Sequence, residues 1–266
     1  MTRPRVKNVW DSPIPGDAAE IERVKIGSAL FERTRERAAS FVGNDLRCAS
    51  CHLDGGQRIG ALPLAGSARR IASRTSDGSG ALEDLIARCF ELCLNGAAPP
   101  RDSVELASLA AYVRWLSVDL PPGPAPAWLR PDGMPPERRI PVARLDARRG
   151  RRQYERFCAA CHGPDGAGSR ERGAPNQRPA PPVWGSMSYS AASGLGRVHS
   201  LAGFLRFAMH WDEPRELSDV DAQDIAAFVN GQPRPLRADP RGWDGAAPED
   251  AVYDRWLYPR NPFGEN

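Results

Sequence analysis

Two five-residue motifs decide the fold: "CASCH" at residues 48–52 and "CAACH" at residues 158–162. Each has the spacing of c-type haem attachment, in which two cysteines bond to the porphyrin and the histidine binds the iron. A zinc site would need two such cysteine pairs around one metal and no following histidine. A redox dithiol would sit in a βαβ pattern, which the sequence lacks. The sequence therefore predicts two covalently bound haem c groups, with these cofactor-binding residues: Cys48, Cys51, His52, Cys158, Cys161 and His162.

The surroundings of the two motifs repeat. A helix-forming stretch precedes each motif and a glycine-rich turn follows it. A second helix-forming stretch lies further along, where Ser103 and Ser218 are suited to be N-caps. This pattern predicts a mainly α protein of two tandem cytochrome c-like domains joined by a proline-rich linker. The expected boundaries are 1–118 for the N-terminal domain, 119–141 for the linker, 142–232 for the C-terminal domain and 233–266 for a proline-rich tail.

The composition excludes two classes of partner. No run approaches the roughly 18 apolar residues of a membrane-spanning helix. The formal net charge is only +3, and no basic tract is interleaved with aromatic residues as in a nucleic-acid groove. The first 20 residues also lack the apolar core of a secretory signal peptide. We therefore expect no membrane span and no nucleic-acid binding.

The occupant of the distal iron position sets the chemistry of a haem. In the C-terminal domain the candidate ligands are Met187, Met209, His199 and His210. Met209 precedes the final predicted helix at the spacing expected of a distal loop, and is favoured over Met187, which lies closer to the motif. His199 and His210 are expected in surface or hydrogen-bonding roles.

The N-terminal domain offers no methionine or second histidine after its motif, which leaves Cys89 and Cys93 as strong distal ligands. Cys93 precedes Tyr112 by 19 residues, as Met209 precedes Phe228, so the repeat favours Cys93. If both cysteines are helical, their Cβ atoms are roughly 5–6 Å apart, which is too far for a disulfide. One cysteine is expected at the iron and the other in the pocket.

The sequence resembles the dihaem thiosulfate dehydrogenases, periplasmic cytochromes that join two thiosulfates into tetrathionate. The resemblance covers nearly the whole chain and is carried by "GNDLRCASCHLDGG", "CFELCLNG", "AAYVRWLS", "CAACHGPDGAG", "PPVWGSMSY" and "DIAAFVNGQPRP". It implies a catalytic N-terminal haem with His52 and Cys89 as iron ligands. It also implies a C-terminal haem that passes electrons onward, with His162 and Met209 as ligands. The resemblance thus selects Cys89 where the internal repeat selects Cys93; Cys89 is preferred, and both are candidate catalytic residues.

The chain departs from the family's pattern at three positions. Two arginines of the family motif are replaced by Leu85 and Leu92, and its serine by Cys93. Two dianions need positive charge nearby, so the loss of both arginines should weaken substrate binding. Four arginines could compensate, although haem propionates or solvent are their expected partners: Arg69, Arg70, Arg74 and Arg88.

Two functions compete on these residues. The first is an oxidoreductase acting on thiosulfate or another small sulfur anion; the second is a dihaem electron carrier without substrate chemistry. A peroxidase-like enzyme or a ligand sensor is a weaker third. Each needs a redox partner, a cytochrome or another electron acceptor. Covalent haem attachment takes place outside the bacterial cytoplasm, so a periplasmic location is expected, with the leader trimmed or the start misassigned.

Overall fold

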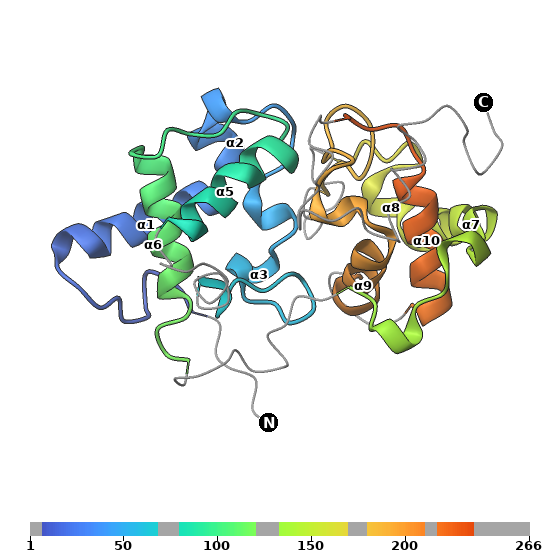
Figure 1. The fold of residues 1–266 in the computed structure, drawn as a ribbon, viewed down its shortest axis with the longest axis horizontal. Coiled ribbons are helices and arrows are strands. Elements are labelled where there is room, and N and C mark those ends of the chain that lie inside the picture. The colour runs from blue at the N-terminus through green and yellow to red at the C-terminus, as the bar shows by residue number, and fades with distance from the viewer. Residues whose placement is uncertain (1–6, 69–79, 121–132, 170–179, 211–216, 237–266) are drawn as a thin grey trace. The chain divides into compact units, whose positions relative to one another are not determined.

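The computed structural model of the chain describes residues 7–68, 80–120, 133–169, 180–210 and 217–236 (Figure 1). Within these ranges the regular structure is helical, without β-strands, as predicted. The chain divides into two compact units. The principal helices are α1 (Ala18–Glu32), α2 (Thr34–Arg37), α3 (Leu53–Gly56), α5 (Ala81–Leu92), α6 (Val104–Trp115), α7 (Ala147–Phe157), α8 (Ala159–His162), α9 (Val198–Ala208) and α10 (Asp219–Asn230). None of the described helices is long and apolar enough to cross a bilayer.

Side-chain caps fix where the long helices begin. The Ser103 hydroxyl accepts a hydrogen bond from the Leu106 N–H, and the Ser218 hydroxyl accepts one from the Asp221 N–H, at 3.3 and 3.1 Å. Both predicted N-caps are therefore confirmed, since each satisfies an N–H group that the first turn leaves without a helical partner. Asp146 caps α7 in the same way, accepting from the Arg149 N–H at 3.0 Å.

The first unit is built on the crossing of α1 and α6, which touch through a glycine. A Cβ added at Gly27 would lie only 2.0 Å from the carbonyl oxygen of Ser108, so the two backbones are in direct contact. One turn further along each helix, the rings of Phe31 and Tyr112 lie 5.3 Å apart. The core of the unit is thus centred on this crossing.

The second unit repeats this crossing with α7 and α10. A Cβ at Gly150 would lie 2.0 Å from the carbonyl oxygen of Asp224. The next turn brings Tyr154 and Phe228 together, with ring centroids 5.6 Å apart. In both units the aromatic residue on the first helix follows the crossing glycine by four positions. The internal repeat inferred from the sequence is therefore present in three dimensions.

Part of the segment predicted as a linker packs on the second unit. Met134 is fully buried, and its N–H donates to the His199 carbonyl at 2.6 Å. The buried Gln223 of α10 holds the same segment, donating to the Arg138 carbonyl and accepting from the Ile140 N–H. Residues 121–132 of the predicted linker and residues 237–266 of the predicted tail lie outside the described residues.

Two short pieces from the N-terminal half, residues 43–46 and 92–95, belong to the second unit. The buried Asn44 donates from its side-chain amide to the carbonyls of Cys93 and Ser188, at 2.8 and 3.1 Å. Its own amide oxygen accepts from the Leu46 N–H at 3.1 Å. A single asparagine thus ties three segments that are distant in sequence.

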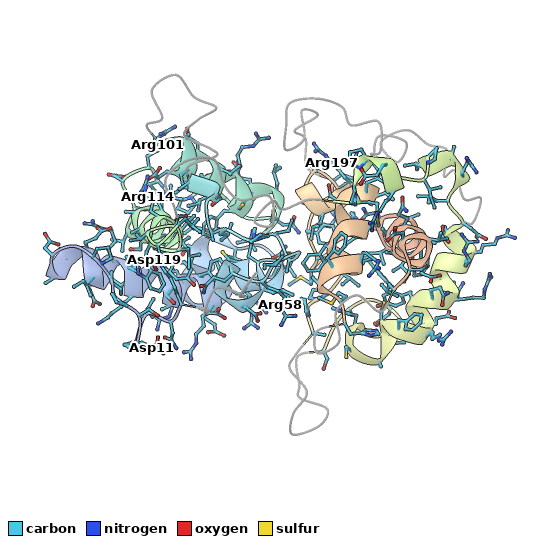
Figure 2. All side chains as sticks on the ribbon, turned by 90° about the horizontal axis from the view of Figure 1, so that it is seen from below. Asp11, Arg58, Arg101, Arg114, Asp119 and Arg197 are labelled. Carbon is cyan, nitrogen blue, oxygen red and sulfur yellow. The ribbon has the colours of Figure 1, made fainter. Side chains whose placement is uncertain are left out.

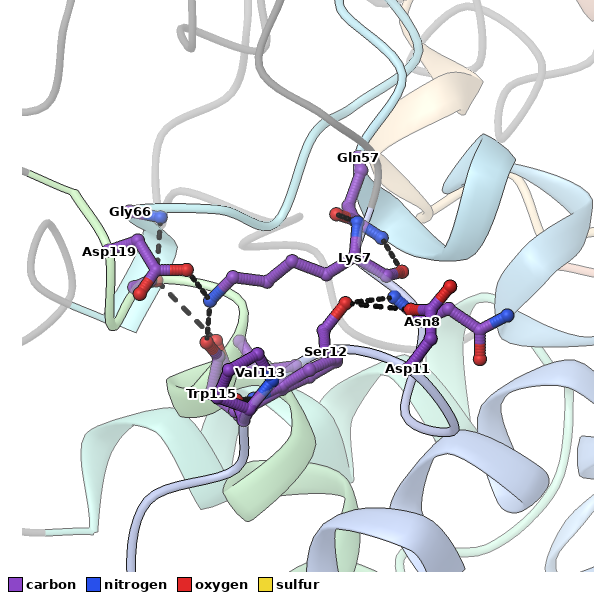
Figure 3. A network of polar contacts seen from close by, with 11 residues as sticks. Lys7, Asn8, Asp11, Ser12, Gln57, Gly66, Val113, Trp115 and Asp119 are labelled. Carbon is purple, nitrogen blue, oxygen red and sulfur yellow. Dashed lines mark hydrogen bonds and ion pairs between the residues drawn. The ribbon is translucent and has the colours of Figure 1, made fainter.

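In the first unit, the stretch beginning at Lys7 is fastened to the C-terminal end of α6 (Figure 3). The Lys7 ammonium donates to the Trp115 carbonyl at 2.9 Å and pairs with Asp119 at 2.7 Å. The backbone of Lys7 exchanges two hydrogen bonds with the Gln57 side-chain amide. A cation at a helix C-terminus is favourable, because the last carbonyls carry partial negative charge. This cluster also holds the loop that follows the first CxxCH motif.

Candidate haem centres

The first motif is held by a buried threonine. The hydroxyl oxygen of Thr34 accepts a hydrogen bond from the Cys48 N–H at 3.0 Å and lies 3.4 Å from the Cys48 thiol. From there the chain makes one tight turn, in which the His52 N–H donates to the Cys48 carbonyl at 3.0 Å. The turn brings both thiols and the histidine of the motif to one place.

His52 is oriented for binding through Nε2. Its Nδ1 lies 2.6 Å from the carbonyl oxygen of Leu62, and Leu62 adopts φ 49°, a conformation that is uncommon for leucine. Burial lowers the pKa of His52, which favours a neutral imidazole. A neutral ring that donates from Nδ1 keeps the lone pair of Nε2 for a metal, as in most metal-binding histidines.

The second motif repeats this arrangement. The His162 N–H donates to the Cys158 carbonyl at 2.9 Å, and Nδ1 of His162 lies 2.9 Å from the carbonyl oxygen of Pro181. Burial also lowers the pKa of His162. Burial raises the pKa of the Cys158 thiol to about 12, whereas Cys161 is exposed. Both motifs thus present an iron-binding nitrogen beside two thiols, and this donor set fits haem c.

A tyrosine hydroxyl supports the turn after each motif. Tyr112 on α6 donates to the carbonyl of Gly55 at 2.9 Å, and Tyr154 on α7 donates to the carbonyl of Gly163 at 2.7 Å. The two units take this tyrosine from opposite partners in the helix crossing. Burial raises the pKa of both phenols, so both stay protonated as donors.

In the second unit, Met209 is the first residue after α9, and its N–H donates to the Leu205 carbonyl at 3.2 Å. The Nε2 atoms of the two histidines considered as alternatives lie beside backbone carbonyls. That of His199 is 2.9 Å from the Ile140 oxygen, and that of His210 is 2.7 Å from the Phe157 oxygen. Both histidines therefore have the hydrogen-bonding roles that were expected.

Met187 lies on a loop that an arginine holds in place. The guanidinium of Arg234 donates to the carbonyls of Val183, Tyr189 and Val229, and stacks on the Tyr189 ring at 4.3 Å. This contact gives a structural reason for the "GQPRP" and "PPVWG" stretches to occur together. The assignment of Met209 rather than Met187 to the iron stays a prediction.

In the first half of the chain, Cys89 lies in the last turn of α5 and Cys93 is the first residue after it. Cys93 therefore occupies the place at the end of α5 that Met209 occupies at the end of α9. The pair is not within one helix, so the helical i,i+4 geometry assumed from the sequence does not apply to it. The choice between Cys89 and Cys93 stays a prediction.

The two leucines that replace the family's arginines are both at least partly buried. Leu92 is 4% exposed, and its carbonyl accepts hydrogen bonds from the N–H and hydroxyl of Ser190. Leu85 is half-buried on α5, as is Arg88, the residue before Cys89. Arg69, Arg70 and Arg74 lie outside the described residues.

Sequence reasoning missed several residues that support the motifs. Thr34 and Asn44 carry no pattern that distinguishes them from surface residues, because their roles depend on distant segments. Arg58 pairs with Asp54 through two nitrogens, at 2.8 and 3.2 Å, beside the first motif (Figure 2 labels Arg58). Their i,i+4 spacing and opposite charge offered a signal.

Comparison with known proteins places the chain in one family. It is 33% identical over 227 residues to the thiosulfate dehydrogenase of Stutzerimonas stutzeri, covering 85% of this chain and 71% of that protein. It is 34% identical over 233 residues to the thiosulfate dehydrogenase of Allochromatium vinosum, covering 85% of this chain and 83% of that protein.

The family model of cytochrome c oxidase, cbb3-type, subunit III matches residues 145–229. Among solved structures, the thiosulfate dehydrogenase TsdBA of Marichromatium purpuratum superposes with a TM-score of 0.72 at 29% identity, covering 89% of this chain. This chain spans 52% of that longer one. These matches imply covalently bound haem c and a cytochrome's role in electron transfer. The chain belongs to the thiosulfate dehydrogenase family of c-type cytochromes.

Proposed function

We propose that the protein is a periplasmic dihaem cytochrome that oxidises a small sulfur anion at its first haem site and exports the electrons through its second. In this proposal His52 and Cys89 bind the first iron, and His162 and Met209 bind the second. The observation that carries it is the shared motif geometry, in which each histidine is fixed through Nδ1 by a backbone carbonyl. When bound, a haem supplies a one-electron redox centre whose potential falls with a thiolate ligand and rises with a methionine.

Thiosulfate is the preferred substrate. Two thiosulfate dianions form one S–S bond and release two electrons, giving tetrathionate without proton transfer. The contribution of this chain is to bring the anions together beside Cys89. Two dianions 4 Å apart repel each other by about 4 kcal/mol even in bulk water, and by more in a less polar pocket. A working site therefore needs cationic side chains.

The alternative is an electron carrier without substrate chemistry, and a specific observation favours it. The two positions that carry arginine in the family motif hold Leu85 and the buried Leu92. Arg88 is the one described residue among the four arginines considered as replacements, and Arg58 is already paired with Asp54. The repulsion between two bound thiosulfate dianions would then be poorly offset by cationic side chains.

The first experiment counts the haems and identifies their ligands. Purified holoprotein is assayed for covalent haem by the pyridine haemochrome method, with a value of two per chain expected. Electron paramagnetic resonance of the oxidised protein should show a low-spin thiolate-type signal that is lost in Cys89→Ala and kept in Cys93→Ala. If neither substitution changes the spectrum, the thiolate ligation is refuted.

The second experiment separates the two functions. Thiosulfate-dependent reduction of hexacyanoferrate(III) is measured for the wild type, for Leu85→Arg and for the size-matched control Leu85→Met. If the protein is an enzyme limited by missing charge, Leu85→Arg should lower KM about tenfold, since one added cation near a dianion is worth about 1–2 kcal/mol. No turnover by any of the three across pH 4–8 would favour the electron carrier.

A further inference from the structure

The helix that leads into the second motif is unusually basic. In its 11 residues, α7 carries five arginines and a single acid, Glu155. Four of the arginines are exposed, and the fifth, Arg149, is half-buried. The chain as a whole has a formal charge of only +3, so this helix concentrates positive charge on one unit.

Two of these arginines are neutralised by carboxylates. Arg149 forms a doubly hydrogen-bonded pair with the buried carboxylate of Asp224 on α10. Arg151 pairs with Glu155 one turn along the same helix, at 3.0 Å. Both pairs belong to the structure of the unit, and neither leaves a net charge.

The other three arginines form a row: Arg148, Arg152 and Arg156. Residues four apart lie on one face of a helix, so this basic row runs along α7 as two successive like-charge pairs, which destabilise a helix. No ion pair neutralises the row within the described residues. Arg152 is close enough to Asp146 to contribute to the lowered pKa of that carboxyl, and Arg156 stacks on the Phe157 ring at 4.7 Å. Because the basic row destabilises the helix, its presence is not explained by a contribution to folding.

The position of the basic row next to the second motif suggests a functional role. Arg156 precedes the first cysteine of the second motif by two residues, and Cys161 of that motif is exposed. A haem held by this motif would therefore be attached next to the C-terminal end of the basic row. The basic row thus ends at the motif from which, in the proposed function, electrons leave the protein.

We infer that the basic row of α7 is the docking face for an acidic one-electron carrier protein that takes electrons from the second haem site. This inference rests on the proposed function, because it needs a haem at Cys158, Cys161 and His162. Clustered charge of one sign raises the association rate of an oppositely charged partner by 10- to 1,000-fold, and salt removes the effect. The positive charge of the row complements an acidic protein surface and repels a basic one.

The test uses the reduced holoprotein and oxidised plastocyanin, an acidic blue-copper protein, as the probe. In each transfer the probe's Cu(II) takes one electron and becomes Cu(I), and no proton moves. The variant is Arg148→Gln/Arg152→Gln/Arg156→Gln. The matched control removes three exposed arginines of the first unit: Arg33→Gln/Arg37→Gln/Arg101→Gln (Figure 2 labels Arg101).

In 10 mM salt we expect the second-order rate constant to fall at least tenfold in the basic-row variant and less than twofold in the control. In 0.5 M salt the three proteins should agree within twofold, because the Debye length is then only about 4 Å. The basic-row variant should unfold at the same or a higher denaturant concentration than the wild type, since like-charge pairs are removed. A lower rate constant in a basic-row variant that is as stable as the wild type would show that the row acts in docking rather than in folding.

Two results overturn the inference. Equal rate constants for the basic-row variant and the control would show that the row does not guide the partner. Reduction of hexacyanoferrate(III) but not plastocyanin by the wild type would exclude an acidic protein partner while leaving electron export intact. Failure with both acceptors would instead refute the proposed function, and the docking face with it.

Discussion

The backbone contact between α7 and α10 at Gly150 leads to a quantitative prediction for Gly150→Ala. The new Cβ would lie 2.0 Å from the Asp224 carbonyl oxygen, whereas ordinary contacts begin near 3.4 Å, so α10 must retreat by about 1.4 Å. Overpacking of this kind costs about 1–3 kcal/mol and occasionally more. The retreat also stretches the hydrogen bond from the Asp146 N–H to the Asp224 carboxylate, now 2.9 Å, for about 1 kcal/mol. The higher helix propensity of alanine stabilises the variant by about 1 kcal/mol.

The free energy of unfolding should therefore fall by about 1–3 kcal/mol in Gly150→Ala. Urea unfolding of the holoprotein, followed through the Soret band and tryptophan fluorescence, measures this change. Gly194→Ala is the control in the same unit, because a Cβ at that position meets nothing within 4 Å, and it should leave stability nearly unchanged. A Gly150→Ala protein as stable as the wild type would refute the direct backbone contact of α7 and α10.

Three further substitutions test the supports of the motifs and the cap of α7. Tyr154→Phe removes the hydroxyl that donates to the Gly163 carbonyl and should cost about 1 kcal/mol of stability in urea unfolding. Thr34→Val keeps the shape but leaves the Cys48 N–H without its acceptor; it should cost about 1–3 kcal/mol and lower the haem content per chain in the pyridine haemochrome assay. Asp146→Ala removes the cap of α7 and should cost about 1 kcal/mol at pH 7, with Asp146→Asn as the control that keeps a cap. Hydrogen bonds to backbone N–H groups hold the pKa of Asp146 below its usual value near 4, so its contribution is present above pH 4 and lost as pH falls. The urea unfolding curves of the wild type and Asp146→Ala should therefore converge as the pH falls below the lowered pKa of Asp146.

The helical fold could be predicted because its main signals are short sequence motifs. The CxxCH motifs and the N-cap serines act on residues only a few positions away, so their roles can be read from local sequence. The structure confirms the N-caps and the helical class. The crossing glycines could not be singled out, because a glycine inside a helix signals close packing only when the opposing backbone is known. Gly27 and Gly150 stand among 25 glycines in the sequence.

The supports of the site depend on pairs far apart in the chain. The amide of Asn44 meets Cys93 and Ser188, and Nδ1 of His162 meets a carbonyl 19 residues away. No period or motif connects such residues, since the interaction depends on how loops return to the core. The part of the expected linker that packs on α9 and α10 escaped prediction for the same reason: its prolines predict the absence of a helix and say nothing of a docking surface.

The preference for Cys89 over Cys93 supposes that the two units need not share loop lengths. The crossing glycine precedes the first cysteine of the motif by 21 residues in the first unit and by only 8 in the second. Part of the extra length forms α2, and part is the segment 43–46, which binds the backbone just beyond α5 through Asn44. This insertion lies before the motif, so it leaves the spacing between the ligand position and the final helix unchanged, and Cys93 keeps the place after α5 that Met209 has after α9. The insertion binds the carbonyl of Cys93 through Asn44, whereas Cys89 lies on α5, and the preference for Cys89 as iron ligand rests on the family resemblance alone.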